Sequence, residues 1–285
     1  MPPSAPTMRV LDVVELLAGS REARLRFSDV VRELGLTQAT THAILTTLCD
    51  RGWANRDPVD KTYSLGPALA VVAARVETAR PLAHSARTAA LQLADEFGYP
   101  TSVVERFGDE LVITAFENAG QQSGGTPGDR IRYAPPFGVA FAAWDTDEQQ
   151  QAWIQRSAAT NEMLARRLEE VLARTRQRGF DVDCTTPALT QAAHVMGTLP
   201  SDGLPDRVRE ITDQLLIEFT TIGFLSDDRT ARQAQPVATI AAPVFDHRGR
   251  VEMIVAVHPL QPLTRARIDA VGRRVSRATA AISGN

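Results

Sequence analysis

The chain has 285 residues, of which 44% are hydrophobic and 23% are charged. These values exclude a disordered chain and are typical of a globular protein with one large or two modest domains. The formal net charge of −3 neither supports nor excludes binding to a nucleic acid. No apolar run approaches the roughly 20 residues of a membrane span, and the N-terminus lacks a secretion signal. We therefore expect a cytoplasmic protein with no membrane partner.

Three short helices are predicted near the N-terminus. Apolar residues recur at helical spacing between Arg9 and Ala18, which predicts the first helix. Ser28 is a suitable N-cap for the second helix, and Gly35 suits the left-handed position that follows it. Thr37 then caps the third helix. Two capped helices joined by a tight glycine turn are the layout of a helix-turn-helix.

The third helix has two different faces. At about 100° per residue, one side carries residues that we expect to pack on the earlier helices: Thr41, Ile44, Leu45 and Leu48. The other side carries small and polar residues that are free to meet base edges: Ala39, His42, Ala43 and Thr46. Gly52 ends this helix.

Two short strands, residues 53–56 and 61–65, are predicted next, joined by the turn Asp57–Asp60. This hairpin completes a winged helix-turn-helix, which places one helix in the major groove of DNA. The candidate DNA-binding residues are Gln38, Ala39, Thr40, His42, Thr46, Arg56 and Lys61. Glutamine pairs with adenine, threonine methyls suit thymine methyls, and Arg56 and Lys61 flank the wing tip, where phosphates would lie. A solvated helix face and plain surface charge are the alternative interpretations.

An alanine-rich helix is predicted for residues 67–76, and Pro81 marks a boundary after it. A longer helix, Leu82–Phe97, then opens a second domain and should bury Leu91, Leu93, Ala94 and Phe97. Hairpins are expected at 102–117 and 237–258. Helices are expected at 145–156 (capped by Asp145), 161–178, 205–223 and 264–282. Strand pairs with helices between them predict an α+β fold with an antiparallel sheet. We divide the chain into a winged helix (1–66), a linker (67–81) and a second domain (82–285).

The chain resembles the IclR family of bacterial transcriptional regulators. The resemblance rests on Arg9–Leu17, Gly35-Leu36, Thr40 with His42, Leu45 with Thr47-Leu48, Tyr63–Gly66, Gly138–Ala143, Arg176–Phe180 and Ile240–Asp246. It implies a linking helix used in dimerisation and a GAF-like domain that binds a small effector. It also implies homodimers or tetramers on palindromic double-stranded DNA operators. We expect a repressor, with activation as the alternative that the sequence leaves open.

The resemblance further implies an aromatic or carboxylic acid as effector. The segments that match the family's effector pocket contain Phe137, Gly138, Phe141, Cys184, Ala241, Ala242 and Pro243. Phe137 and Phe141 are open to a second interpretation as plain core residues. The chain departs from the family pattern at Ala43, where a basic residue is usual, in a shorter segment 134–138, and in a longer segment 185–236.

No catalytic set, metal site or cofactor motif is recognisable. The chain has no GxSxG, Walker or GxGxxG motif, and its five histidines lack metal-ligand spacing. Only Cys184 and His194 lie near one another, and the two cysteines, Cys49 and Cys184, are expected to be free thiols. Glu105 and Arg106 are candidates for a polar ligand contact or for cross-strand pairing at the surface. We therefore expect a regulator and not an enzyme, without cofactor. A winged helix used only for protein contacts or constitutive DNA binding, and an enzyme with a winged-helix appendage, remain the alternatives.

Overall fold

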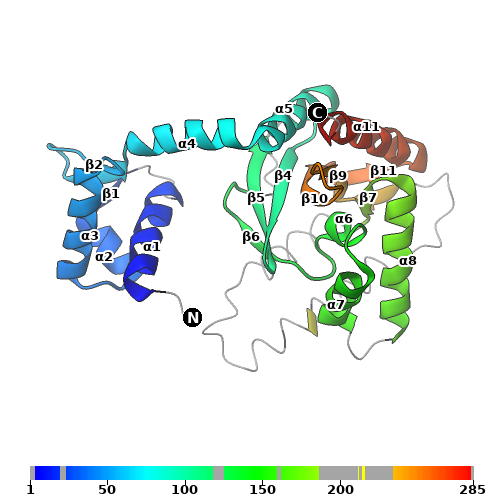
Figure 1. Cartoon of the computed structure of the whole chain (residues 1–285), viewed down its shortest axis with the longest axis horizontal. Coiled ribbons are helices and arrows are strands. Elements are labelled where there is room, and N and C mark those ends of the chain that lie inside the picture. Colours follow the sequence, from blue (N-terminus) through cyan, green and yellow to red (C-terminus); the bar gives the residue numbers. More distant parts are fainter. Residues whose placement is uncertain are drawn as a thin grey trace. The chain divides into compact units, whose positions relative to one another are not determined.

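The computed structural model describes residues 4–19, 24–117, 125–158, 162–185, 211, 214–215 and 234–283. The chain divides into two compact units, residues 1–81 (unit 1) and 82–285 (unit 2), which Figure 1 shows in blue to cyan and in teal to red. Within the described ranges, no helix is long and apolar enough to cross a membrane.

Unit 1 is a small helical head with a three-stranded sheet. Its elements are α1 (Ala5–Gly19), β1 (Leu25–Arg26), α2 (Phe27–Leu34), α3 (Gln38–Asp50), β2 (Ala54–Arg56), β3 (Thr62–Leu65) and α4 (Ala68–Ala79). The strands are antiparallel in the order β1-β3-β2. One apolar cluster, which includes Val13, Val30, Leu45 and Tyr63, holds the three helices and the hairpin together. The winged helix-turn-helix predicted from the sequence is confirmed.

The start of α2 differs from the prediction. Ser28 is not the N-cap, because it lies inside α2, which begins at Phe27. The carboxylate of Asp29 accepts a hydrogen bond from the Arg26 amide at 3.0 Å, so the helix starts earlier than a serine cap would place it. Gly35 does adopt the left-handed conformation, with φ at 60°. The hydroxyl of Thr37 does cap α3, accepting from the Thr40 amide at 3.2 Å.

Unit 2 is built on a six-stranded sheet. After α5 (Pro81–Phe97) come β4 (Thr101–Phe107), β5 (Glu110–Glu117), β6 (Arg130–Arg132), α6 (Val139–Ala142), α7 (Asp147–Ala158), α8 (Glu162–Arg178) and β7 (Asp181–Asp183). The chain resumes with β8 (Gln235–Val237), β9 (Thr239–Phe245), β10 (Val251–Val257), β11 (Gln261–Leu263) and α11 (Arg265–Ser283). The strand order is β6-β5-β4-β10-β9-β7, with every pair antiparallel. Strands β8 and β11 form a separate pair.

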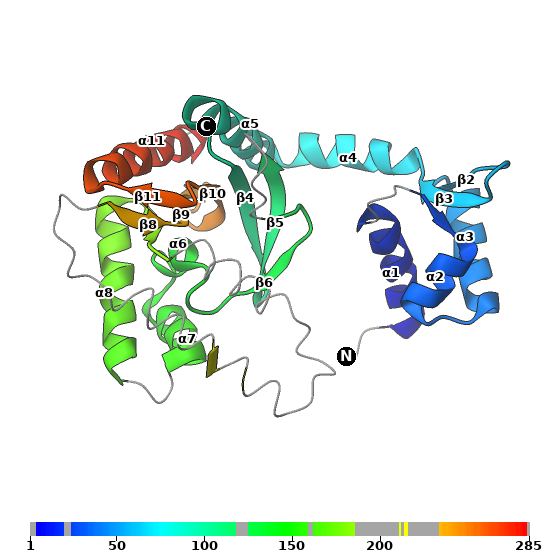
Figure 2. The same cartoon turned by 180° about the vertical axis from the view of Figure 1, so that it is seen from behind.

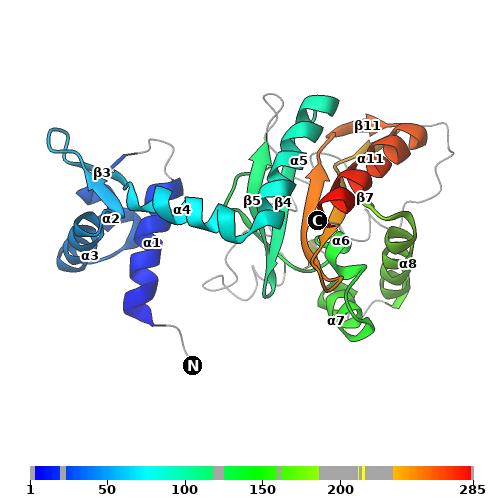
Figure 3. The same cartoon turned by 45° about the horizontal axis from the view of Figure 1, so that its top comes forward.

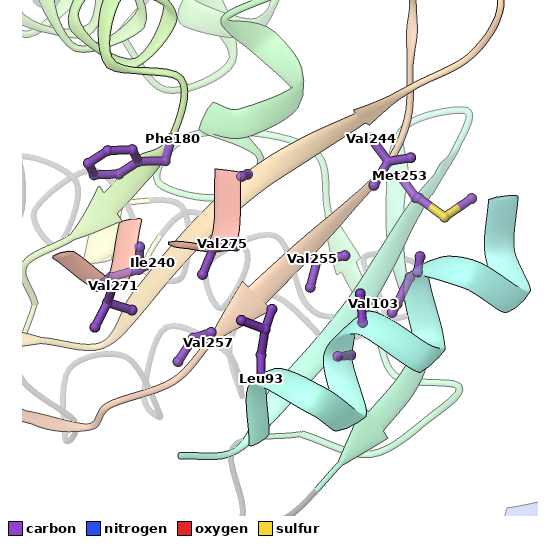
Figure 4. Packing of buried hydrophobic residues seen from close by; sticks show 14 of the residues in the cluster. Leu93, Val103, Phe180, Ile240, Val244, Met253, Val255, Val257, Val271 and Val275 are labelled. Atoms are coloured by element: carbon purple, nitrogen blue, oxygen red, sulfur yellow. The ribbon is translucent and has the colours of Figure 1, made fainter. Parts of the chain in front are cut away.

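Helices cover both faces of this sheet, which confirms the predicted α+β class. Helices α5 and α11 lie side by side over one face (Figures 2 and 3), and Arg274 of α11 bonds Glu96 of α5 at 2.9 Å. Figure 4 shows the core on that face, where Leu93 lies near Val103, and Val271 and Val275 lie near Ile240. Helices α6 and α8 pack on the opposite face in a second apolar cluster.

Two local predictions in unit 2 are wrong. Leu91 is 44% exposed, because α5 turns Ala90, Leu93 and Ala94 toward the sheet instead. Asp145 is not the cap of α7. That role falls to Thr146, whose hydroxyl accepts from the Gln149 amide at 3.3 Å. The helix expected at 205–223 and His194 lie outside the described residues, apart from residues 211, 214 and 215.

Candidate nucleic-acid interface and effector site

The outer face of α3 is the candidate DNA-reading surface. Thr41, Ile44, Leu45 and Leu48 are buried against the rest of unit 1, because apolar residues at helical spacing face the core. The opposite side leaves four of the predicted DNA-binding residues exposed: Gln38, Ala39, His42 and Thr46. Apart from Asp50 at its end, the helix carries no acidic side chain, and it has no lysine or arginine.

Thr40 differs from the other predicted readers. Its side chain is half-buried, and its hydroxyl lies 2.9 Å from the Thr37 hydroxyl at the start of the helix. Its amide also donates to Thr37. Thr40 is therefore engaged in the helix cap, and its hydroxyl is less available to a base than that of Thr46.

The wing presents its two cations to solvent. Arg56 lies on β2 with its guanidinium 5.9 Å from the Tyr63 ring centroid, and Lys61 follows the turn with its ammonium donating to the Pro58 carbonyl. The turn is braced by Asp57, which accepts hydrogen bonds from the Val59 amide at 2.8 Å and from the Asp60 amide. These bonds favour the ionised carboxylate and hold the pKa of Asp57 below its ordinary value. The two cations thus sit on an ordered hairpin beside an uncharged helix face.

The predicted effector segment lies under the sheet of unit 2. Gly138 has φ at 85°, and a Cβ atom there would lie 2.6 Å from the Tyr133 ring. Phe141 on α6 is 1% exposed and meets the Tyr133 ring edge-on, with centroids 6.3 Å apart. The Phe137 carbonyl accepts from the indole of Trp153 at 3.1 Å. Phe141 is a member of the apolar cluster on the α6 side, and Phe137 is half-buried against that cluster; a contact of either residue with an effector stays a prediction.

The remaining predicted effector residues divide between the two faces of the sheet. Alternation along β9 places Ala241 and Pro243 on the α6 side, whereas Ala242 belongs to the core under α5 and α11. Cys184, after β7, also packs against the core under α5 and α11. Ala242 and Cys184 therefore do not lie on the same side as Phe137 and Phe141, and no single cavity on one face gathers all seven residues.

A polar group that the sequence analysis missed lies on the α6 side of the sheet. His258, just after β10, has its Nε2 atom 2.9 Å from the Ser102 hydroxyl and its Nδ1 atom 3.2 Å from the Thr239 hydroxyl. Phe116 stacks on the imidazole with centroids 5.8 Å apart. We call these four residues the His258 cluster. The signal in the sequence is a pair of polar side chains, Thr239 and His258, at positions where strand alternation predicts inward-facing residues.

Glu105 and Arg106 point to opposite faces of the sheet. Glu105 is 3% exposed and lies opposite Met253, a member of the core under α5 and α11. Arg106 lies on the α6 side and bonds Asp145 at 2.6 Å. Both are thus engaged in the interior rather than displayed as a surface pair.

No group of three or more His, Cys, Asp or Glu side chains that could hold a metal ion occurs within the part of the chain that the structure describes. Within the described residues no disulfide is formed, and Cys49 and Cys184 are both half-buried. Cys49 and Cys184 belong to different units.

Comparisons with known proteins agree with this architecture. Residues 6–58 match the family model of the IclR helix-turn-helix domain. A stretch of 88 residues is 36% identical to the glycerol operon regulatory protein of Streptomyces coelicolor and spans 31% of this chain and 33% of that protein.

The solved structures extend the likeness over the whole chain. An IclR transcriptional regulator from Alicyclobacillus acidocaldarius is 16% identical with a TM-score of 0.63, covering 99% of both chains. An IclR homologue from Microbacterium hydrocarbonoxydans, complexed with 4-hydroxybenzoate, is also 16% identical with a TM-score of 0.63, covering 98% of this chain and 99% of its own. At these identities the likeness establishes the fold.

Proposed function

We propose that this chain is an effector-responsive, DNA-binding repressor of the IclR type: its residues 6–58 match the model of the IclR helix-turn-helix domain, and its fold is similar to that of IclR regulators of known structure. The observation that carries the proposal is the exposed face of α3, where Gln38, His42 and Thr46 project together beside the wing. Hydrogen-bonding side chains on a helix of this kind read base edges in the major groove. Arg56 and Lys61 would hold the flanking phosphates.

The protein would act as a homodimer or a tetramer. Helix α4 exposes three valines, with Val71 at 65%, Val72 at 43% and Val76 at 46%, and α1 exposes Met8 and Leu11. Exposed apolar residues concentrated on helices mark surfaces that another protein covers. A second copy of the chain is the partner that a palindromic operator requires, because the symmetry of the operator mirrors that of the protein.

The effector would bind on the α6 side of the sheet at the His258 cluster. Hydroxyl and imidazole groups among apolar side chains fix the orientation of a small polar ligand, and the Phe116 ring suits an aromatic one. The homologue complexed with 4-hydroxybenzoate supports an aromatic carboxylic acid as the first class to test.

The mechanism would be a population shift. An effector that binds one arrangement of the two heads better than another moves the equilibrium toward it, and only one arrangement matches the half-site spacing of the operator. A coupling free energy of about 1–3 kcal/mol between the two sites would change occupancy of the operator by about 5- to 150-fold.

The test is fluorescence anisotropy of the purified protein on the intergenic DNA beside its own gene, with and without benzoate and 4-hydroxybenzoate. We expect specific binding that Thr46→Ala weakens by about 10-fold, whereas Thr88→Ala, an exposed threonine on α5, leaves it unchanged. Binding that does not distinguish this DNA from a scrambled duplex would refute DNA reading by α3. Specific binding that neither acid alters would refute this effector class.

A further inference from the structure

The segment Tyr133–Asp145 connects β6 to α7 and carries α6. Its two ends meet: the Tyr133 hydroxyl donates to Asp145 Oδ2 at 2.8 Å. Asp145 follows Tyr133 by 12 positions in the sequence, so this bond closes the segment into a loop. Phe137, Gly138 and α6 lie inside that loop.

A side chain of the sheet joins the two ends. Arg106 on β4 donates to the same carboxylate oxygen of Asp145 at 2.6 Å. Its guanidinium lies 4.9 Å from the Tyr133 ring centroid and 6.0 Å from that of Phe141. Asp145 therefore receives one hydrogen bond from a neutral donor and one from a charged donor, and bonds to a carboxylate are of the stronger, charge-assisted kind. We call Arg106, Tyr133 and Asp145 the clip.

The phenol of the clip remains a donor at every pH at which the protein would work. Tyr133 is 4% exposed, and its burial together with the Asp145 charge raises the pKa of the phenol well above its ordinary value. The ring is also enclosed, because Trp153 and Arg156 of α7 lie against it, with centroid distances of 6.4 Å and 5.5 Å. The hydroxyl therefore has a fixed position, and its bond is directed to Asp145.

The rest of the segment is held by side chains of α7 and α8. The Pro135 carbonyl accepts from Ser157 at 3.0 Å, and the Ala143 carbonyl accepts from Arg176 at 2.6 Å. The loop and its two helices thus form one body. A second ion pair, Arg156 with Asp109 at 2.5 Å, also links this body to the β4–β5 turn, but Asp109 is 79% exposed, and exposed pairs contribute little.

We propose that the clip is a positioning device that holds the loop and α6 against the sheet, and that it thereby sets the affinity of the effector site without touching the effector. This rests on the proposed function for the location of the effector. That the clip holds α6 against the sheet does not depend on the proposed function and can be tested without DNA or effector. An element with a clipped and an unclipped arrangement is the kind of two-state element through which a ligand shifts a population.

The first experiment is hydrogen exchange, followed by mass spectrometry, on the full chain without ligand. The reporters are the α6 amides: those of Phe141 and Ala142 donate to the Gly138 carbonyl at 2.9 Å and 3.0 Å. Tyr133→Phe keeps the ring and removes the hydroxyl, and Asp145→Asn removes the charge. Each should speed exchange in α6 by about 10-fold while β9 and β10 exchange at the wild-type rate.

Asp109→Asn is the matched control, because it removes the exposed pair of the same body and should leave α6 unchanged. Exchange in α6 at the wild-type rate in Tyr133→Phe and Asp145→Asn would overturn the proposal. So would equally faster exchange throughout unit 2, because the clip would then only contribute to overall stability. Neither result depends on whether the chain binds DNA or an effector.

The second experiment uses 4-hydroxybenzoate as the probe in the anisotropy assay. If it acts on the wild-type protein, Tyr133→Phe should change the half-effective concentration by about 5-fold or more, with operator affinity in its absence unchanged. An unchanged half-effective concentration would overturn the positioning role at the effector site. If the probe does not act on the wild type, the proposed effector class fails while the exchange experiment still decides the clip.

Discussion

Replacement of Gly138 by alanine is the sharpest test of how the loop is packed. Two costs add. The backbone at φ 85° is strained for any residue with a Cβ atom, by about 1–2 kcal/mol. The new methyl would also lie 2.6 Å from two atoms of the Tyr133 ring. Because that ring is 4% exposed and enclosed, it cannot swing away, and overpacking of this kind costs about 1–3 kcal/mol. We expect Gly138→Ala to lower the free energy of unfolding of unit 2 by about 2–5 kcal/mol.

Two other glycines separate the two costs. Gly249 has φ at 74°, and a Cβ atom added there would meet no atom within 4 Å, so Gly249→Ala should show the backbone strain alone. Gly272 lies inside α11, and a Cβ there would overlap the Phe180 ring, which is 3% exposed. Gly272→Ala should therefore show overpacking without strain, reduced by the better helix propensity of alanine, about 1 kcal/mol. All three variants gain similarly from the stiffer unfolded chain, which cancels in the comparison.

The measurement is urea denaturation of the full chain followed by circular dichroism, with the transition of unit 2 assigned as the one that shifts in these three variants. The expected order of destabilisation places Gly138→Ala first. If Gly138→Ala costs no more than Gly249→Ala, the Tyr133 ring is not packed against Gly138 as described, and the argument for an enclosed phenol fails with it.

Three further outcomes are expected. Thr37→Ala should lower the thermal stability of unit 1 by about 1 kcal/mol because it removes the cap of α3, whereas Thr46→Ala should leave melting unchanged and weaken operator binding. Burial raises the pKa of Asp181 to about 6, so the folded carboxyl keeps its proton after the unfolded one has lost it. Stability should therefore fall by about 2–3 kcal/mol as the pH rises from about 4 to about 6, and Asp181→Asn should flatten that part of the urea-midpoint curve. Arg56→Gln should reduce the slope of log affinity against log salt by about 1 per head, and an unchanged slope would place Arg56 away from phosphate.

The faces of α3 were predictable from the sequence, and its neighbours show why other details were not. Helical periodicity alone predicts that Ile44 and Leu48 are buried while His42 and Thr46 are exposed, because a helix packed on one side places its apolar residues on that side. The cap of α2 was not predictable in this way. Ser28 and Asp29 can both bond a free amide at the start of a helix, and which one does so depends on where the first turn begins. Here the helix begins one residue before Ser28, and the carboxylate of Asp29 accepts from the Arg26 amide.

The proposed effector site shows a different limit. Ser102 and His258 are separated by 156 positions in the sequence, and they meet only because β10 lies beside β4 in the strand order. Local patterns identify strands but not which strands become neighbours, so the His258 cluster could not be assembled from spacing. The same limit applies to Asp145, which suits a helix cap locally but is taken by Arg106, 39 positions earlier.

The uncharged face of α3 has a consequence for how an effector could control binding. Each phosphate contact changes the salt dependence of affinity by about one unit of slope, and α3 offers no cation for such contacts. In the proposed complex, each head would take its phosphate contacts from the wing cations Arg56 and Lys61 and not from α3, and it would depend on base contacts by Gln38, His42 and Thr46 for the rest of its affinity. Two linked heads raise affinity by about 10²–10⁴ without any new contact, and lose that gain when the geometry prevents both from engaging. In the proposed dimer, a small shift of one head would then release the operator, because most of the affinity would come from simultaneous engagement of both half-sites.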